Sequence, residues 1–311
     1  MYTVNKCLCC GSENLGASYG LVAPFIAQYV FKSSHTHTHT CRLFHCNDCG
    51  FRFFESRFED SEVDRLYNDY RGLNYYSVRH RFEPWYTRSI NDGIGNDQIT
   101  INFRKEYLQN FLHAHIPIQK VKRLLDYGGD HGQFIPDNIA EECYVFEVSG
   151  VEPIPGVILI DEMSELEKQI FDIVILSAVL EHISDPLAIL RKIHGILSPN
   201  GYLLLEVPYE SFYYRNWFGD SFTQKYLNLL AHSPMQVVKF VDLYSTFSKI
   251  KLHCIPPMGF VKLHEHINFF SETSFYPLLQ SAGFSVIALE KHNQNSQAGL
   301  NATFTCLAKV N

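Results

Sequence analysis

The sequence lacks any apolar run long enough to cross a membrane as a helix. Its most apolar stretches, near residues 171–180 and 202–207, fall well short of the ~20 residues that a spanning helix needs. The first residues also lack the apolar core of a secretory signal peptide. From these absences we expect a cytoplasmic protein that makes no use of a membrane.

Positive charge is scarce as well. The chain has 26 Lys and Arg against 33 Asp and Glu, a net charge of -7, and no run of basic residues. Proteins that live on phosphate backbones usually carry basic faces, so nucleic acid is not an expected partner. Internal repeats are absent too. With 46% hydrophobic residues, the 311 residues suffice for one large domain or two to three smaller ones.

The cysteines are unevenly distributed, with six of nine before residue 50. A disulfide framework is not expected in the cytoplasm. Two segments, 7–11 and 46–50, contain Cys-x-x-Cys-Gly, a spacing that brings two thiolates to one ion. The pattern predicts a structural zinc ribbon over residues 1–58, with Zn²⁺ bound by Cys7, Cys10, Cys46 and Cys49. Cys9 and Cys41 are spare thiols, and either could replace one of these ligands.

Residues 35–40 read HTHTHT. In a strand, alternation places His35, His37 and His39 on one face, where they could bind a metal weakly. A polar strand leading into the second cysteine pair explains the same pattern. The sequence leaves both interpretations open.

Residues 59–118 are polar and aromatic with helical spacing, which predicts a helical linking segment. Beyond them, apolar strands alternate with helices, which is typical of a doubly wound, mostly parallel, Rossmann-like α/β sheet. Two final strands with only a polar loop between them predict an antiparallel hairpin that closes the sheet. This domain is predicted over 119–311, with an aromatic-rich cap insertion at about 209–265. The strands are expected at 121–129, 143–149, 156–161, 171–180, 201–208, 284–292 and 301–310, and the helices at 132–142 and 185–197.

A glycine-rich loop, LLDYGGDHGQF at 124–134, follows the first of these strands. Backbone N–H groups in such a loop can hold an anionic or polar ligand. The dinucleotide fingerprint Gly-x-Gly-x-x-Gly does not occur in this loop. Its second glycine would be residue 130 or 131, and these are Asp130 and His131. The spacing is instead acid-x-Gly-x-Asp-x-Gly, from Asp126 to Gly132. An NAD-linked function is therefore not expected.

This loop resembles that of the class I S-adenosylmethionine-dependent methyltransferases, which reads acid-x-Gly-x-Gly-x-Gly. Asp130 stands at the middle glycine, and Asp tolerates a positive φ better than most residues. The resemblance covers about 119–311 and includes the final hairpin. It implies that S-adenosyl-L-methionine is the cofactor. The ribose hydroxyls would bind Glu147 and the adenine amino group Asp161, and the remaining cofactor-binding residues would be Asp126, Gly128, Gly129, Asp130, Gly132, Ser177 and Ala178.

A narrower resemblance concerns the acceptor. An N-terminal zinc ribbon combined with the segment KLHEHINFF at 262–270 is similar to nucleotide-sugar C-methyltransferases, although their further C-terminal domain is not seen here. This resemblance implies Glu265 and His266 as a pair that supplies the general base, and Tyr75 or Tyr76 reaching over the active site. His264 and His182 are weaker candidates. We expect a small-molecule acceptor, such as a sugar nucleotide or a glycan precursor.

Two alternatives remain. Some RNA methyltransferases carry N-terminal zinc clusters, and the chain could be one of them. It could also be a non-catalytic zinc-ribbon adaptor whose cofactor site has degenerated at Asp130. The sequence leaves open the oligomeric state and whether carbon, oxygen or nitrogen is methylated.

Overall fold

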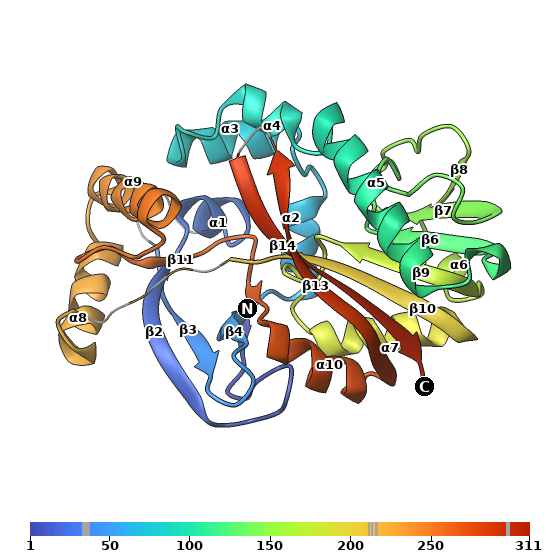
Figure 1. The fold of residues 1–311 in the computed structure, drawn as a ribbon. Helices are drawn as coiled ribbons and strands as arrows, with labels where there is room; N and C mark the ends of the chain where they lie inside the picture. Colours follow the sequence, from blue (N-terminus) through green and yellow to red (C-terminus); the bar gives the residue numbers. More distant parts are fainter. Residues whose placement is uncertain (33–37, 211, 213, 215–216, 297–298) are drawn as a thin grey trace. The chain divides into compact units, whose positions relative to one another are not determined.

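The computed structural model describes residues 1–32, 38–210, 212, 214, 217–296 and 299–311. The chain divides into two compact units (Figure 1). The first unit contains residues 1–7, 11–92 and 210–269, and the second contains 8–10, 93–209 and 270–311. The predicted domain boundaries, at residues 58 and 118, stay a prediction.

The second unit contains a seven-stranded sheet in the order β13-β14-β10-β9-β6-β7-β8. Strands β10, β9, β6, β7 and β8 are parallel, whereas β14 runs antiparallel to both of its neighbours. The predicted mixed sheet, closed by an antiparallel hairpin, is therefore confirmed. The strands are β6 (Arg123–Tyr127), β7 (Glu142–Phe146), β8 (Val157–Ile160), β9 (Phe171–Ser177), β10 (Leu197–Pro208), β13 (Phe284–Ser296) and β14 (Gly299–Val310).

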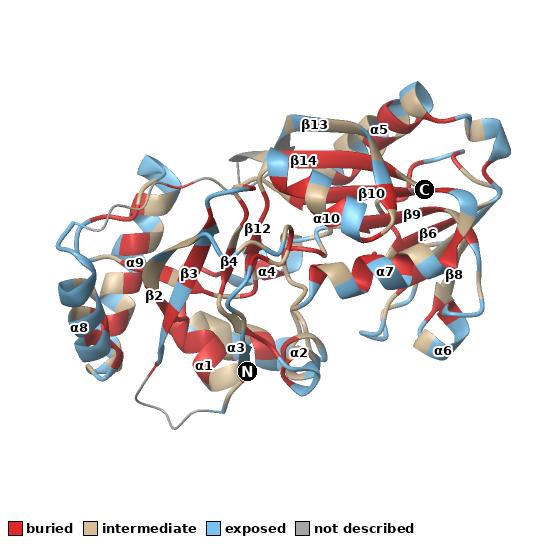
Figure 2. Ribbon diagram, turned by 90° about the horizontal axis from the view of Figure 1, so that it is seen from below, coloured by how far each residue is buried: buried red, intermediate tan, exposed pale blue. Residues whose placement is uncertain are grey.

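Helices on both faces of this sheet bury its apolar central strands (Figure 2). Leu108 and Leu112 of one helix pack with Ile173 and Leu204 of the sheet. Helix α7 (Pro186–Ile196) begins where predicted. The carboxylate of Asp185 caps it by accepting a hydrogen bond from the Ala188 N–H at 3.0 Å. The helices of this unit are α5 (Gln98–His115), α6 (Met163–Leu166), α7 (Pro186–Ile196) and α10 (Phe275–Ser281), with short 3-10 turns η1 (Ile118–Lys120) and η2 (Glu272–Ser274).

The helix predicted at 132–142 is wrong. The chain from Gly128 to β7 forms only turns. Pro136 removes a backbone donor from this segment, and Asn138 adopts a left-handed φ of 57° that ends any helical run. No helix N-terminus follows the glycine loop, so a ligand there must rely on the N–H groups of the loop itself.

The first unit contains a five-stranded sheet in the order β11-β2-β3-β4-β12 and a short β1-β5 pair. Its long β2-β3 ladder runs antiparallel from Leu15 opposite Cys46 to Leu21 opposite Thr40. The strands are β1 (Tyr2–Thr3), β2 (Leu15–Val22), β3 (Thr40–Cys46), β4 (Arg52–Phe54), β5 (Ser56–Arg57), β11 (Val261–Leu263) and β12 (Asn268–Phe269). The helices are α1 (Pro24–Tyr29), α2 (Asp60–Tyr67), α3 (Leu73–Phe82), α4 (Arg88–Gly93), α8 (Asp220–Ala231) and α9 (Met235–Leu252).

The predicted insertion completes the sheet of the first unit. Strand β11 pairs in parallel with β2, and β12 pairs antiparallel with β4. Buried side chains from both parts of the chain, including Val22, Phe54, Leu263 and Ile267, share one core. Residues 210–269 therefore fold together with the N-terminal residues.

Among the described residues, no helix is both long enough and apolar enough to span a bilayer. Of the histidines in the HTHTHT stretch, His35 and His37 lie outside the described residues. His39 is exposed and precedes β3.

Candidate functional site

The glycine loop after β6 is held in left-handed backbone conformations. The φ angles are 71° at Gly128, 56° at Asp130 and 73° at Gly132. The predicted tolerance of Asp130 for a positive φ is thus confirmed. At Gly129 a Cβ atom would lie 2.3 Å from Cγ of Asp126, so only glycine fits beneath the end of the strand.

Asp126, in β6, is 2% exposed, and its Oδ1 has no hydrogen-bond partner among the described residues. Burial raises its pKa to about 7. The nearby guanidinium of Arg104 opposes this rise, whereas the carboxylates of Glu206 and Glu147 add to it. A buried acceptor without a partner is costly, so a ligand that brings a donor or a cation would be stabilised here.

Glu147 follows β7 directly and is half-buried. Its Oε2 accepts from the N–H of Asp130 at 3.2 Å, and its Oε1 accepts from Val148 and Ser149 at 2.9 and 3.0 Å. The carboxylate is therefore turned toward the glycine loop. A carboxylate has about four lone-pair sites, so it retains capacity for a further hydroxyl group.

The other predicted cofactor residues lie at the same edge of the sheet, after β8 and β9. Asp161 is exposed and follows β8. Ser177 ends β9 and donates to Oε2 of Glu206 at 2.6 Å, and Ala178 adopts a φ of 56°. Ligands of α/β sheets bind at the carboxyl ends of the strands, which is where these residues lie.

Two residues of this edge were missed in the sequence. Arg104 of α5 forms an ion pair with Glu206 of β10 at 2.8 Å, with side chains 12% and 1% exposed. Arg104 also donates to the Ser177 hydroxyl and lies over the ring of Phe134 at 4.0 Å. In the sequence, Glu206 could have been noticed as an acid within the apolar run LLLEVP. Nothing in the pattern of the helix distinguishes Arg104 from other basic residues.

In the first unit, His266 contacts a carboxylate that the sequence did not suggest. Its Nδ1 hydrogen-bonds to Oε1 of Glu210, and Lys249 donates to Oε2 of Glu210 at 2.7 Å. Burial would raise the pKa of Glu210, but the charges of Lys249 and His266 outweigh it and hold that pKa well below its usual range. Histidine, carboxylate and lysine thus form a chain of charge-assisted hydrogen bonds.

Glu265 has other partners than His266. The phenol of Tyr75, fully buried in α3, donates to its Oε1, and Arg79 donates to both carboxylate oxygens at 3.3 Å. Tyr76, the next residue of α3, is half-buried and stacks on His80 with 5.4 Å between ring centroids. The two members of the predicted Glu-His pair thus each contact further polar groups, Tyr75 and Arg79 for Glu265 and Glu210 for His266.

Two weaker candidates are also placed. His264 lies 3.2 Å from Glu83, measured from Nε2 to Oε1. His182 is half-buried in the turn that follows β9.

The predicted zinc ligands lie together. The Sγ atoms of Cys7, Cys10, Cys46 and Cys49 are all within 4.8 Å of one another, and those of Cys7 and Cys49 are 3.5 Å apart. Sulfur ligands at about 2.3 Å from a tetrahedral zinc would be roughly 3.8 Å apart, so the cluster fits this ion. Cys9 and Cys41 are buried but belong to no such group among the described residues. Burial raises the pKa of Cys41, which disfavours the thiolate that zinc requires.

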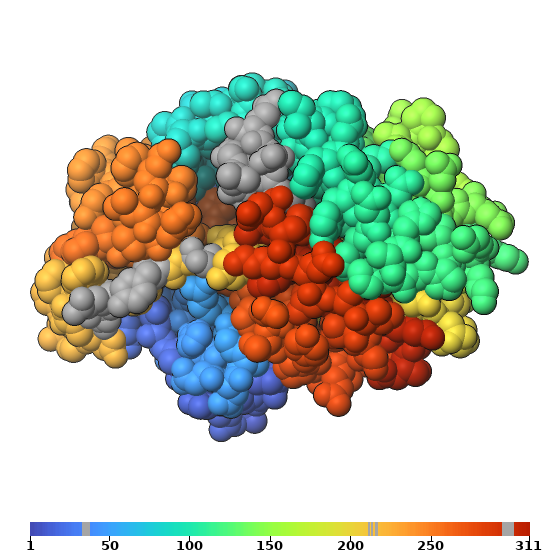
Figure 3. All heavy atoms as spheres, in the orientation of Figure 1, coloured from blue at the N-terminus to red at the C-terminus, as the bar shows by residue number. Residues whose placement is uncertain are grey.

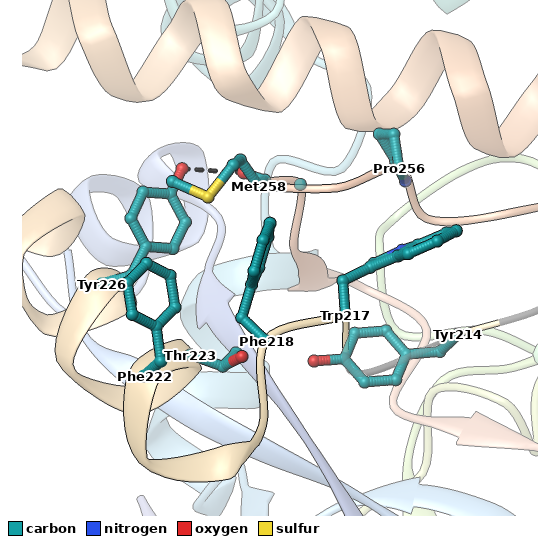
Figure 4. A pocket seen from close by; sticks show the side chains of 9 residues that line it. Tyr214, Trp217, Phe218, Phe222, Thr223, Tyr226, Pro256 and Met258 are labelled. Atoms are coloured by element: carbon teal, nitrogen blue, oxygen red, sulfur yellow. Dashed lines mark hydrogen bonds between the residues drawn. The ribbon is translucent and has the colours of Figure 1, made fainter.

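The first unit also contains a shallow aromatic depression that is open to solvent (Figure 4). The phenol of Tyr226 closes one side by donating to the Met258 carbonyl at 2.7 Å. The lining of the depression includes Tyr214, Trp217, Phe218, Phe222, Tyr226 and Met258.

Comparisons with solved structures find methyltransferases that match this chain at low identity. The 1,6-didemethyltoxoflavin-N1-methyltransferase of Burkholderia thailandensis, solved with 1,6-didemethyltoxoflavin and S-adenosylhomocysteine, is 15% identical, covering 86% of this chain and 98% of its own, with a TM-score of 0.42. A SAM-dependent methyltransferase of Methanosarcina mazei is 16% identical, covering 64% and 96%, with a TM-score of 0.38. A possible histamine N-methyltransferase of Thermotoga maritima is 15% identical, covering 76% and 98%, with a TM-score of 0.40.

No curated protein matches the chain. A protein family described as a methyltransferase domain matches residues 101–289, which include the glycine loop and all the strand ends described above. Because this match covers more than half of the sequence, the chain belongs to the methyltransferase-domain family and is an enzyme that takes its methyl group from S-adenosylmethionine.

Proposed function

We propose that the enzyme methylates a small-molecule acceptor, such as a sugar nucleotide or a glycan precursor, with His266 as general base. The hydrogen bond between Nδ1 of His266 and the Glu210 carboxylate is the observation on which this proposal rests. Imidazole titrates near neutral pH, and a carboxylate partner is the usual means of making it a competent base.

Residues of the second unit would hold the cofactor. The Oδ1 of Asp126, which has no hydrogen-bond partner in the described part of the chain, suits the cationic ammonium group of a methionine moiety. Glu147 would bind the ribose hydroxyls, Asp161 the adenine amino group, and the N–H groups of the glycine loop would face the remaining polar atoms. Ser177 and Ala178, at the end of β9, would line the same site. When bound, S-adenosylmethionine supplies an electrophilic methyl group on its sulfonium sulfur.

The chain's own contribution to the reaction is then proton removal and alignment. Glu210 on Nδ1 selects the tautomer with the proton on that nitrogen and leaves Nε2 as the acceptor. The acceptor's proton passes to Nε2, and Glu210 stabilises the resulting imidazolium. Lys249 holds the carboxylate in place. The His266 side chain is 36% exposed, so an acceptor can reach it.

We assign Glu265 a positioning role in place of the pairing with His266. Through Tyr75 and Arg79 it anchors α3, which carries Tyr76. Tyr76 is the candidate donor of a hydrogen bond to a developing enolate. The acidic charge balance favours a small-molecule acceptor over RNA. The zinc cluster would serve folding alone.

The test is methyl transfer from methyl-labelled S-adenosylmethionine to a panel of sugar nucleotides, with RNA as a second arm. We expect His266→Gln to lower kcat at least ~100-fold near neutral pH with unchanged cofactor affinity, the usual contribution of a general base. Glu210→Gln should lower kcat less and shift its pH profile. The exposed His113 of α5 provides the matched control, His113→Gln.

Wild-type turnover in His266→Gln would remove His266 as the base. Labelling of RNA but of no sugar nucleotide would favour the RNA methyltransferase alternative.

A further inference from the structure

Helix α9 has its polar residues inside and its apolar residues outside. Its buried residues are Val238, Asp242, Ser245 and Ser248. A surface helix normally turns its apolar stripe toward the core. The opposite face carries exposed large hydrophobic side chains at helical spacing, which are Val237 (46%), Phe240 (73%), Leu243 (48%), Tyr244 (44%), Phe247 (60%) and Ile250 (63%). We call these six residues the α9 stripe; Figure 2 shows exposed and buried residues alternating along the helix.

The inward polar residues lock the helix in this orientation. Asp242 contacts the Lys262 ammonium at 3.2 Å. Ser245 donates to the Val241 carbonyl at 2.7 Å and accepts from the Phe260 N–H at 3.1 Å. A roll that buried the α9 stripe would break these contacts and leave buried polar groups unpaired. The outward stripe is therefore specified by the structure.

Further exposed apolar residues lie in the same stretch of the first unit's sequence. Among the described residues, every exposed phenylalanine and tryptophan lies between residues 217 and 258. Part of this region, from light orange to orange, is seen at the surface in Figure 3. Large exposed apolar patches mark interaction sites.

We propose that the α9 stripe is the contact surface with a second copy of this chain, packed antiparallel about a two-fold axis between Leu243 and Tyr244. The apolar positions are symmetric in sequence about that point. Phe240 and Phe247 are equally far from it, as are Val237 and Ile250. A two-fold axis places each residue against its mirror position in the second copy. Phe240 of one copy thus meets Phe247 of the other, and Leu243 meets Tyr244.

The charges on α9 are compatible with this pairing. Its only acid, Asp242, is buried against Lys262. In the antiparallel register, Lys251 of one copy meets Gln236 of the other, so like charges do not face each other. Lys239 donates to the Arg81 carbonyl and Lys249 is paired with Glu210. Two of the three lysines of α9 are thus engaged with neighbouring residues, whereas helices that bind anionic membranes present a basic rim to the lipid.

The size of the surface also suits a dimer. From their exposed fractions, the six side chains present on the order of 700 Å² of apolar area, close to the ~800 Å² that each partner buries in a standard interface. Paired aromatic residues at the centre of such an interface typically supply much of its affinity.

Sedimentation velocity on the full chain, with zinc bound, tests the proposal over about 1–100 µM. We expect a species of twice the chain mass. Phe240→Glu and Phe247→Lys should each raise the dissociation constant at least ~100-fold, as expected for loss of a central aromatic. A mixture of these two variants should regain dimer, because the carboxylate introduced in one copy then faces the ammonium introduced in the other. Ile158→Glu, at a residue 49% exposed in β8, is the matched control and should leave the dimer intact.

Far-ultraviolet circular dichroism and zinc content show whether each variant is folded. A wild-type monomer at all concentrations would overturn the proposal, as would dimers that persist in both folded variants or a mixture that stays monomeric. Co-sedimentation of the wild type, but not of Phe240→Glu, with vesicles containing anionic lipid would assign the stripe to a membrane surface and also overturn it.

Discussion

The carboxylate of Glu147 accepts a hydrogen bond from the backbone N–H of Asp130, with 3.2 Å between Oε2 and N. This bond joins the acid after the second parallel strand to the position where the glycine loop departs from its usual pattern. Because the contact uses the backbone of Asp130, the loop and the acid can stay coupled whichever side chain is present. The substitution of Asp for Gly is therefore compatible with a working cofactor site.

Changes at Asp130 should affect stability more than cofactor binding. We expect Asp130→Gly to be neutral or stabilising, because glycine adopts the observed φ of 56° without strain. Asp130→Ala should lower the free energy of unfolding by about 1 kcal/mol relative to Asp130→Gly, because the Cβ atom of alanine makes a left-handed backbone conformation unfavourable. Denaturant unfolding measures both. A tenfold gain in cofactor affinity in Asp130→Gly would instead show that the Asp130 side chain blocks the site.

Glu147→Gln should weaken cofactor binding by ~1–3 kcal/mol, or about 10- to 100-fold, through loss of charged hydrogen bonds. Isothermal titration with S-adenosylhomocysteine gives the affinity. Glu142→Gln, at the amino end of the same strand, is the control and should bind as the wild type does. Unchanged affinity in Glu147→Gln would remove Glu147 from the site.

Cofactor affinity should rise with pH because of Asp126. Its pKa of about 7 means that the carboxyl group is largely neutral at pH 6 and ionised at pH 8, so affinity for a cationic ligand should increase ~10-fold over that range. Binding near pH 7 should release a proton, seen as a buffer-dependent enthalpy. Asp126→Asn should abolish the pH dependence, and Asp161→Asn should retain it. A flat profile in the wild type would contradict the proposed contact.

The same carboxyl group should affect the stability of the ligand-free protein. Its pKa is raised above the unfolded value, so the folded state binds the proton more tightly. The stabilisation from that proton is complete below pH ~4 and is lost as the pH rises through about 7. Asp126→Asn should therefore stabilise the protein at pH 8 relative to the wild type, as thermal unfolding would show.

Cys46→Ser should release the zinc and lower the unfolding temperature, because a structural zinc site contributes directly to folding. Metal analysis by mass spectrometry should give one zinc per wild-type chain. Cys9→Ser and Cys41→Ser should keep it, since neither thiol belongs to the four-cysteine cluster. Full retention in Cys46→Ser together with loss in Cys9→Ser would reassign the ligands.

Local patterns in the sequence were enough to predict most strands of the second unit and their alternation with helices. Uninterrupted apolar runs marked the central strands, and the Asp185-Pro186 pair marked the start of α7. The two Cys-x-x-Cys-Gly segments likewise identified the four cysteines that cluster. Each of these features depends on neighbours within a few residues. The helix expected after the glycine loop failed for a local reason as well, since Pro136 and Asn138 favour turns over helix.

The sequence by itself determined the strands of the second unit, the turn at the glycine loop and which four cysteines cluster, because strand periodicity, turn residues and ligand spacing are short-range properties. Only the tertiary structure decided that His266 meets Glu210, 56 residues away, that Arg104 meets Glu206, and that α9 turns its apolar side outward. Those contacts depend on how whole elements pack and on which buried polar groups find partners. No pattern within a single segment encodes that outcome.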